Sequence, residues 1–153
     1  MVWFGRGEGG QAGRRGNVRQ PPVAVKNYLS PMTRLLLLGT GTPAPLAHRA
    51  GSSYLVQTGD ETLLFDCGPG SVRRLLEAGV NPAGIDHLFL THLHYDHCVD
   101  FAYLVLTRWD QGAGRIPELP VYGPAPLVRM SSRLFAADGA FGPDLQARTE
   151  HPG

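Results

Sequence analysis

The sequence predicts one α/β domain in which strands alternate with helices. Short apolar runs typical of strands are followed by stretches whose apolar residues recur at helical spacing. The 153 residues match the length of about one domain, and 42% hydrophobic against 18% charged residues is typical of a chain that folds. The 20 glycines and 13 prolines predict many turns and exclude a coiled coil.

Residues 1–31 are rich in glycine and basic side chains and show no hydrophobic periodicity. We expect them to form a disordered basic extension. Two interpretations remain open: an arm that contacts nucleic acid, or an extension upstream of a true start at Met32. The domain itself is predicted to span residues 32–153.

The elements of the domain follow from Leu35 onward. The Leu35–Leu38 run predicts a buried strand, which the glycines and proline of residues 39–43 end. Ser71 is typical of an N-cap, and Gly79 of the end of the helix that follows it. The other predicted strands are Ser53–Thr58, Thr62–Phe65, His87–Leu90 and Val121–Tyr122, and the other predicted helices are Val99–Leu106 and Pro126–Ala136.

One segment carries metal-binding chemistry, the motif Thr91-His92-Leu93-His94-Tyr95-Asp96-His97. In an extended chain His92 and His94 point the same way, so both imidazoles can share one metal ion. Asp96 and His97 follow where the chain turns and can face a second position. Imidazole and carboxylate suit zinc, and also manganese or iron, so the spacing predicts a two-metal centre. The alternative is a set of surface or capping histidines without metal.

This motif, THLHYDH, is preceded by GTGTP and LLFDCGPG, and together they resemble the metallo-β-lactamase superfamily. The resemblance runs from about Met32 to about Pro126 and is closest to the branch of ribonuclease Z, arylsulfatase-like and phosphodiesterase-like hydrolases. It implies a four-layer αβ/βα sandwich with two zinc ions in the complete protein, held at the sheet rim between two similar halves. Ribonuclease Z usually has glycine where Tyr95 stands, which argues against tRNA processing specifically.

The resemblance also implies residue roles. His92 and His94 would bind the first metal, Asp96 and His97 the second, and Asp66 would support the metal loop from the neighbouring strand end. Asp96 would also act in catalysis by orienting the attacking water. The expected reaction is hydrolysis of a small-molecule ester or a nucleic-acid phosphodiester.

A complete family member carries further ligands in its second half. We therefore expect residues 32–153 to be the N-terminal part of such a domain, truncated here and weakly active or inactive alone. His151 is a candidate for one further ligand. Half a sandwich would leave an apolar sheet face exposed, so the alternative function is a non-catalytic metal-binding or interaction fragment that pairs through this face, for instance as a homodimer.

The composition also bears on membrane partners and on the cellular compartment of the protein. No apolar run approaches the roughly 18 residues that a membrane helix needs, so we expect no membrane partner. Two cysteines cannot supply a disulfide framework, which favours the cytoplasm.

Overall fold

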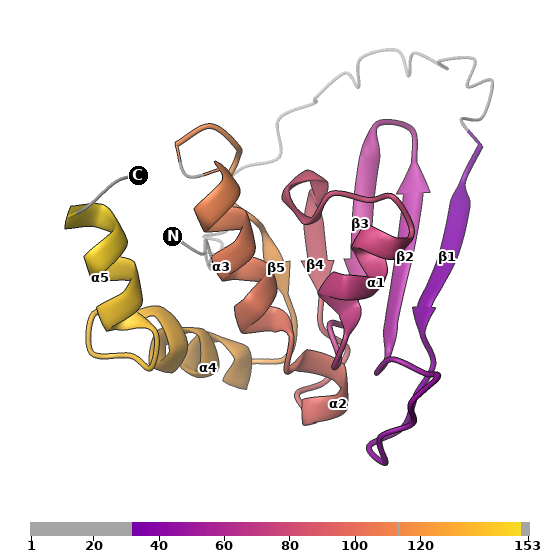
Figure 1. Ribbon diagram of the computed structural model, residues 1–153, viewed down its shortest axis with the longest axis horizontal. Coiled ribbons are helices and arrows are strands. Elements are labelled where there is room, and N and C mark those ends of the chain that lie inside the picture. Colours follow the sequence, from indigo (N-terminus) through magenta and orange to yellow (C-terminus); the bar gives the residue numbers. More distant parts are fainter. Residues whose placement is uncertain (1–31, 113, 151–153) are drawn as a thin grey trace, which may run out of the picture.

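The computed structural model describes residues 32–112 and 114–150, except for the side chain of Glu150 (Figure 1). The predicted basic extension over residues 1–31 lies outside the described residues, as does His151. The elements that are described form a mixed sheet with helices, which confirms the predicted α/β class.

The sheet has five strands in the order β1-β2-β3-β4-β5. The first three pair antiparallel, and β3, β4 and β5 pair parallel. Parallel neighbours place the carboxyl ends of β3 and β4 at the same rim of the sheet. The strands are β1 (Arg34–Gly39), β2 (Ser53–Thr58), β3 (Glu61–Phe65), β4 (His87–Phe89) and β5 (Val121–Tyr122).

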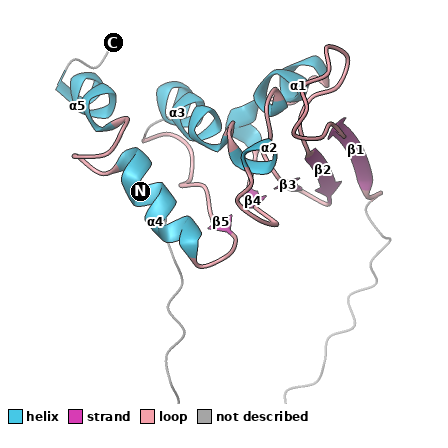
Figure 2. Cartoon of the chain, turned by 90° about the horizontal axis from the view of Figure 1, so that it is seen from below, coloured by secondary structure: helices cyan, strands magenta, loops and turns pink. Residues whose placement is uncertain are grey.

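The helices α1 and α3 cover one face of the sheet, and α4 and α5 lie beyond β5 (Figures 1 and 2). None of the described elements covers the other face (Figure 2). No helix among the described residues is long and apolar enough to cross a membrane. The helices are α1 (Ser71–Glu77), the 3-10 helix η1 (Pro82–Gly84), α2 (Tyr95–Cys98), α3 (Phe101–Gly112), α4 (Pro126–Phe135) and α5 (Gly142–Glu150).

The core lies between the covered face of the sheet and the helices. Cross-strand register places one apolar residue of each strand in a row across this face, because paired residues share a face. The row is Leu36, Leu55, Leu64, Leu88 and Val121. It packs with Val72 and Leu75 of α1 and with Phe101 and Leu104 of α3, all of which are buried. The described residues therefore enclose a complete core on this side.

The neighbouring row points to the uncovered face. It consists of Leu37, Tyr54, Phe65, Phe89 and Tyr122. Phe89 stacks on Phe65 with ring centroids 4.9 Å apart and on Tyr122 at 4.7 Å. The prediction that Leu35–Leu38 is a buried strand is therefore wrong in part. Leu35 and Leu37 are 62% and 64% exposed, because β1 is an edge strand and this face has no second layer among the described residues.

Two helix boundaries differ from the sequence prediction, and helix α5 has no predicted counterpart. Ser71 is the first residue of α1 rather than its N-cap, and Gly70 takes the cap position with a φ of 88°. The predicted helix Val99–Leu106 begins two residues later and runs to Gly112, after the short helix α2. Helix α5 was not predicted, because its sequence GPDLQARTE has no run of apolar residues at helical spacing.

A half-buried carboxylate, Asp100, and a buried guanidinium, Arg108, hold elements together through backbone atoms. Asp100 precedes α3, and one of its carboxylate oxygens accepts the Val72 N–H at the start of α1 at 3.3 Å. Arg108 of α3 donates to the carbonyl oxygens of Pro82 and Ala83 in η1 and, at 3.2 Å, to that of Pro117. Burial lowers the pKa of Arg108 and raises the pKa of Asp100.

Candidate metal centre

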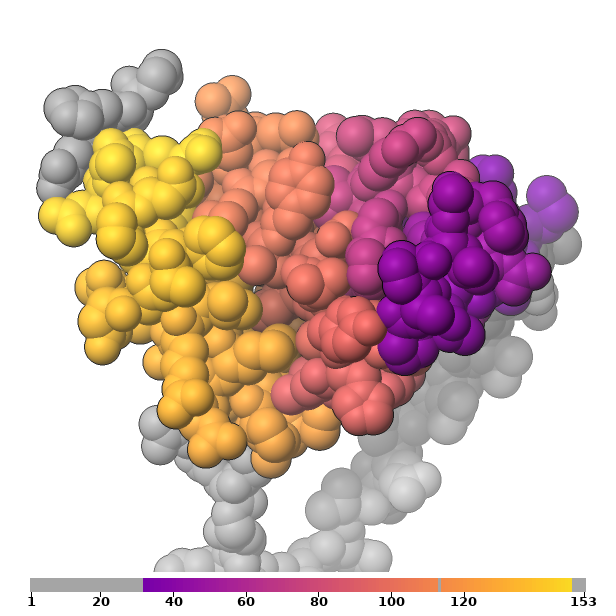
Figure 3. Space-filling model, turned by 60° about the horizontal axis from the view of Figure 1, so that its bottom comes forward, coloured from indigo at the N-terminus to yellow at the C-terminus, as the bar shows by residue number. Residues whose placement is uncertain are grey.

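The motif residues lie at the rim where β3 and β4 end. Asp66 directly follows β3, and Thr91 and His92 follow β4 after one residue. The loop of residues 40–50 lies beside this segment on the molecular surface (Figure 3), and the Tyr95 hydroxyl donates to the Pro43 carbonyl oxygen at 2.8 Å. The parallel pairing of β3 and β4 therefore brings Asp66 next to the histidine motif.

Three imidazoles form a cluster at this rim. The ring centroids of His92 and His94 lie 4.7 Å apart, and those of His92 and His97 lie 4.0 Å apart. His94 is exposed, whereas His92 and His97 are half-buried. The predicted grouping of the three histidines is thus present. His92 lies closer to His97 than to His94, and these centroid distances do not by themselves assign a ring to either metal position.

Asp66 connects this cluster to the strands. Its side chain is almost fully buried and accepts hydrogen bonds from the Thr91 N–H at 2.8 Å, the Thr91 hydroxyl at 2.9 Å and His97 Nδ1 at 2.7 Å. Because Nδ1 donates to a carboxylate, the Nε2 of neutral His97 is left as the ring's acceptor. Asp66 takes a φ of 59°, a left-handed conformation that aspartate tolerates better than most residues.

Asp96 supplies the observation that points most directly to a cation. Its side chain is buried, its Oδ2 lies 3.5 Å from His97 Nε2, and its Oδ1 meets no hydrogen-bond partner among the described residues. A buried carboxylate oxygen without a partner is costly, and a divalent cation would satisfy it. The residue types and this one unpaired oxygen therefore fit a metal ion.

The arrangement does not form a closed metal site. Among the residues that the structure describes, no group of three or more His, Cys, Asp or Glu side chains is placed to hold a metal ion as it stands. The cluster is therefore a set of candidate ligands gathered in one place.

Close backbone packing fixes the turn that carries Asp96. The Ser52 N–H donates to the Asp96 carbonyl oxygen at 3.2 Å, and the Cys67 N–H to the His97 carbonyl oxygen at 2.7 Å. A Cβ on Gly68 would lie 2.0 Å from the Asp96 carbonyl oxygen, so only glycine fits there. Sequence reasoning missed Ser52, Gly68 and Thr91. Thr91 and Gly68 carried a signal, because they belong to the quoted motifs THLHYDH and LLFDCGPG, whereas Ser52 carried none.

The two cysteines lie beside the cluster. Both are free and buried, as expected from their small apolar side chains. Burial raises the pKa of both thiols, most strongly that of Cys67.

Two further histidines lie elsewhere. His87 is on the uncovered face of the sheet, where its ring contacts those of Phe89 and Tyr122. His48 is exposed in the loop between β1 and β2. Neither joins the cluster.

Comparison with known proteins gives consistent matches. Residues 46–151 match the model of the metallo-beta-lactamase superfamily. Ribonuclease Z of Mycolicibacterium gilvum is 40% identical over 121 residues, which are 78% of this chain and 41% of that protein. Ribonuclease Z of Mycobacterium avium is 45% identical over 94 residues, 61% of this chain and 34% of that protein. The chain thus spans well under half the length of these curated relatives.

Solved structures show the same fold. The metallo-beta-lactamase fold protein YhfI from Bacillus subtilis has a TM-score of 0.57 and 31% identity over 69% of this chain and 42% of its own. Human tRNase Z, short form, has a TM-score of 0.58 and 31% identity over 65% of this chain and 36% of its own. The matched family model covers more than half of the sequence. This chain therefore belongs to the metallo-beta-lactamase superfamily.

Proposed function

We propose that this protein is part of a metal-dependent hydrolase that cleaves phosphodiester bonds, with zinc as the metal and manganese or iron as alternatives. The observation that carries the proposal is the buried, unpaired Asp96 Oδ1 beside three clustered imidazoles. The ribonuclease Z relatives, at 40% identity, support a nucleic-acid phosphodiester as the substrate.

The proposed roles follow the sequence prediction. His92 and His94 would hold one metal, and Asp96 and His97 would hold the second. Bound divalent metal would polarise the phosphoryl oxygen and lower the pKa of the attacking water. Asp66 keeps His97 oriented through the 2.7 Å hydrogen bond to Nδ1, so that Nε2 is presented to the metal. Asp96 would hold the metal through Oδ1, and its carboxylate would also orient the attacking water.

We also propose that the described part of the chain supplies only some of the metal ligands. Residues 32–153 supply the N-terminal part of the domain, and the remaining ligands come from polypeptide beyond this part. Two facts support it: the chain covers 41% of the M. gilvum relative, and none of the described elements covers the second apolar face of the sheet. Slow turnover by this chain alone is then expected.

We further propose a cytoplasmic location, because the two free cysteines agree with a reducing compartment.

The uncovered face favours a second candidate function. A non-catalytic metal-binding module could pair with another copy of itself through the row of Leu37, Phe65, Phe89 and Tyr122. Such a module would keep the histidine cluster and bind metal without turnover.

Turnover distinguishes the two functions. The full chain is supplied with zinc and assayed for hydrolysis of a chromogenic phosphodiester, together with His94→Ala and with His87→Ala as a matched control on the far face. The hydrolase proposal expects slow, zinc-dependent turnover that is lost in His94→Ala and kept in His87→Ala. Zinc binding without turnover would favour the pairing module. Turnover that survives in His94→Ala would contradict the proposed site.

A further inference from the structure

The hydroxyl of Thr91 contacts both the carboxylate of Asp66 and the imidazole of His92. Its Oγ1 lies 2.9 Å from Asp66 Oδ1 and 3.0 Å from Asp66 Oδ2. The same oxygen lies 3.0 Å from His92 Nδ1. Thr91 and His92 are neighbours in the chain, whereas Asp66 is 25 residues away, directly after β3. One hydroxyl therefore connects the buried carboxylate to a candidate metal ligand.

A count of protons fixes the direction of these hydrogen bonds. A threonine hydroxyl has one proton to donate, and a carboxylate can only accept. The Thr91 proton therefore goes to Asp66, because two oxygens 2.9 Å apart would otherwise face each other without a proton between them. The contact with His92 then takes its proton from the ring, so Nδ1 of neutral His92 donates to Thr91. The Nε2 of His92 keeps the lone pair that a metal ion would bind.

His97 is held in the same tautomer by a direct contact. Its Nδ1 donates to Asp66 Oδ2 at 2.7 Å, which leaves its Nε2 as the acceptor. The rings of His92 and His97 are neighbours, with centroids 4.0 Å apart. Asp66 thus sets the tautomer of both rings, that of His97 directly and that of His92 through the Thr91 hydroxyl. In the proposed function the two rings serve different metals, so one carboxylate would orient a ligand of each.

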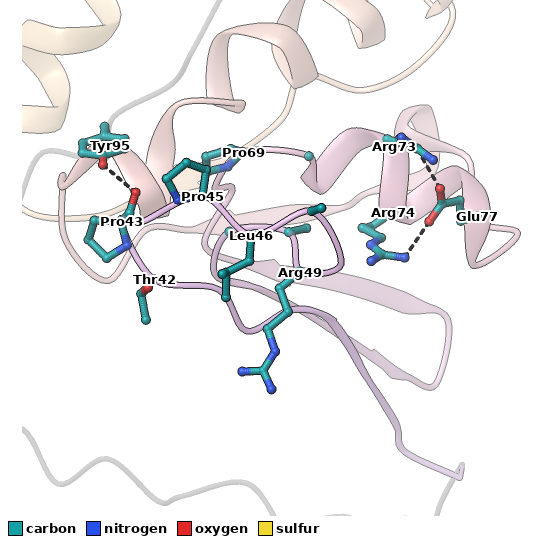
Figure 4. Close-up of a pocket in the computed structure, with 14 residues that line it drawn as sticks. Thr42, Pro43, Pro45, Leu46, Arg49, Pro69, Arg73, Arg74, Glu77 and Tyr95 are labelled. Atoms are coloured by element: carbon teal, nitrogen blue, oxygen red, sulfur yellow. Dashed lines mark hydrogen bonds and ion pairs between the residues drawn. The ribbon is translucent and has the colours of Figure 1, made fainter.

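The other contacts of the motif side chains do not orient these two rings. The Tyr95 hydroxyl donates to the Pro43 carbonyl oxygen at 2.8 Å, at the wall of a cavity of about 520 Å³ between the loop of residues 42–51 and helix α1 (Figure 4). Of the described residues that line this cavity, none is a histidine of the motif. Within the described part of the chain, Asp66 and Thr91 are thus the groups that direct the ring nitrogens.

Thr91 can be altered without disturbing the core. The residue is exposed, whereas the Asp66 side chain that it contacts is buried. The backbone N–H of Thr91 also donates to Asp66 Oδ1 at 2.8 Å, and this contact survives any change of the Thr91 side chain. Loss of the hydroxyl should therefore remove the link to His92 and leave the turn in place.

We propose that Thr91 is a positioning residue that relays the Asp66 carboxylate to His92 and so presents His92 Nε2 to the proposed metal centre. The inference rests on the proposed function and deepens it, because it names what orients a ligand of the first metal. The tautomer of His92 is a property of the metal-free protein, so its measurement does not depend on turnover.

The first measurement is made on the natural sequence. The full chain is labelled with ¹⁵N and kept in EDTA at about pH 8, where imidazoles are mostly neutral. Long-range ¹H–¹⁵N correlation NMR then reports which ring nitrogen carries the proton. His92 and His97 should both carry it on Nδ1, whereas the exposed His48 should populate both tautomers. A His92 ring protonated on Nε2 would overturn the inference, and this result needs no variant.

Matched variants isolate the hydroxyl. Thr91→Val removes it and keeps the size and branching of the side chain. His92 should then populate both tautomers, while His97 keeps its proton on Nδ1 because it contacts Asp66 directly. Zinc affinity, measured by calorimetric titration, should fall about tenfold, since a partner that orients a ligand is lost. Thr91→Ser keeps the hydroxyl and should keep both properties, and Thr62→Val, near the other end of β3, should change neither.

The outcomes separate this inference from the proposed function. An unchanged His92 tautomer or an unchanged zinc affinity in Thr91→Val would overturn the inference. Equal losses in Thr91→Ser and Thr91→Val would also overturn it, because the hydroxyl would then not be the group that matters. The expected tautomers without phosphodiester hydrolysis would contradict the proposed function alone. Zinc-dependent hydrolysis by a protein whose His92 is protonated on Nε2 would contradict this inference alone.

Discussion

The two faces of the sheet carry similar apolar side chains but differ in what covers them. One row, from Leu36 to Val121, lies under α1 and α3 and is closed into a core. The next row, from Leu37 to Tyr122, is equally apolar and stacks its aromatic rings in the open. Burial in this molecule is thus decided by the layer that packs on a strand, since the alternating strand pattern offers apolar groups to both faces.

The difference has a consequence for the candidate metal centre. The cluster is supported from the covered side, through Asp66 after β3 and the backbone contacts of Ser52 and Cys67. These hydrogen bonds connect the motif to the ends of β2 and β3. The following predictions test whether the two faces differ energetically as they do structurally.

The largest effect is expected in the covered core. Phe101→Ala should lower the free energy of unfolding by about 3–5 kcal/mol, because Phe101 is fully buried and the substitution leaves a cavity. Leu37→Ala on the uncovered face should cost less than about 1 kcal/mol, since Leu37 is already largely in water. Urea denaturation of both variants makes the comparison. Equal losses would mean that the second face is also buried in solution.

A slightly smaller effect is expected at the turn under Asp96. Gly68→Ala forces a Cβ to within 2.0 Å of the Asp96 carbonyl oxygen and should destabilise the fold by about 3 kcal/mol. Gly84→Ala is the matched control, because a Cβ there meets no atom within 4 Å. Thermal unfolding measures both, and a Gly68→Ala melting temperature as high as that of the control would contradict the packing described.

The hydrogen bond between Asp66 and His97 should affect zinc affinity more than the stability of the fold. Asp66→Asn keeps the size of the side chain and removes the charge that orients His97 Nδ1. We expect zinc affinity to fall about 10- to 100-fold, with a loss of about 1–3 kcal/mol in stability from the altered hydrogen bonds. Calorimetric titration with zinc measures the first quantity. Unchanged affinity would remove Asp66 from the site.

On the uncovered face, polarity should affect association and leave stability nearly unchanged. Leu35→Thr/Leu37→Thr places β-branched residues, which suit a strand, at these positions of β1 and reduces the apolar surface. We expect stability to change by less than about 1 kcal/mol and any self-association seen by analytical ultracentrifugation to weaken. Association that persists unchanged would show that copies pair elsewhere.

The smallest effect is a pH dependence at Asp100. Burial raises its pKa above the unfolded value of about 3.9, so the folded state holds this proton more tightly than the unfolded state. Its contribution to stability is therefore full below the unfolded pKa and lost as pH rises through the raised one. Asp100→Asn should remove this trend, so the stability of the natural protein relative to the variant should fall with rising pH in denaturation curves. A rise would contradict the assignment.

Sequence patterns that span a few residues predicted most of the secondary structure and the gathering of the motif histidines. The strands, the α1 and α4 positions, and the gathering of His92, His94 and His97 follow from spacing within a few residues. The contacts of Asp66 with Thr91 and His97 cross 25 and 31 residues, and were expected only in outline from the family resemblance. Gly68 and Ser52 matter because both lie close to the backbone of Asp96, and no sequence pattern predicts that approach. Leu35 is exposed because none of the described elements packs on its face of the sheet. The apolar character of the residue does not show whether another layer covers it.

The most direct test is anomalous diffraction at the zinc edge from crystals of the full chain soaked in zinc. We predict a peak within coordination distance of Asp96 Oδ1 and at least one of the clustered imidazoles. Occupied zinc elsewhere, with Asp96 and the histidines empty, would contradict the central claim that this motif is a metal centre.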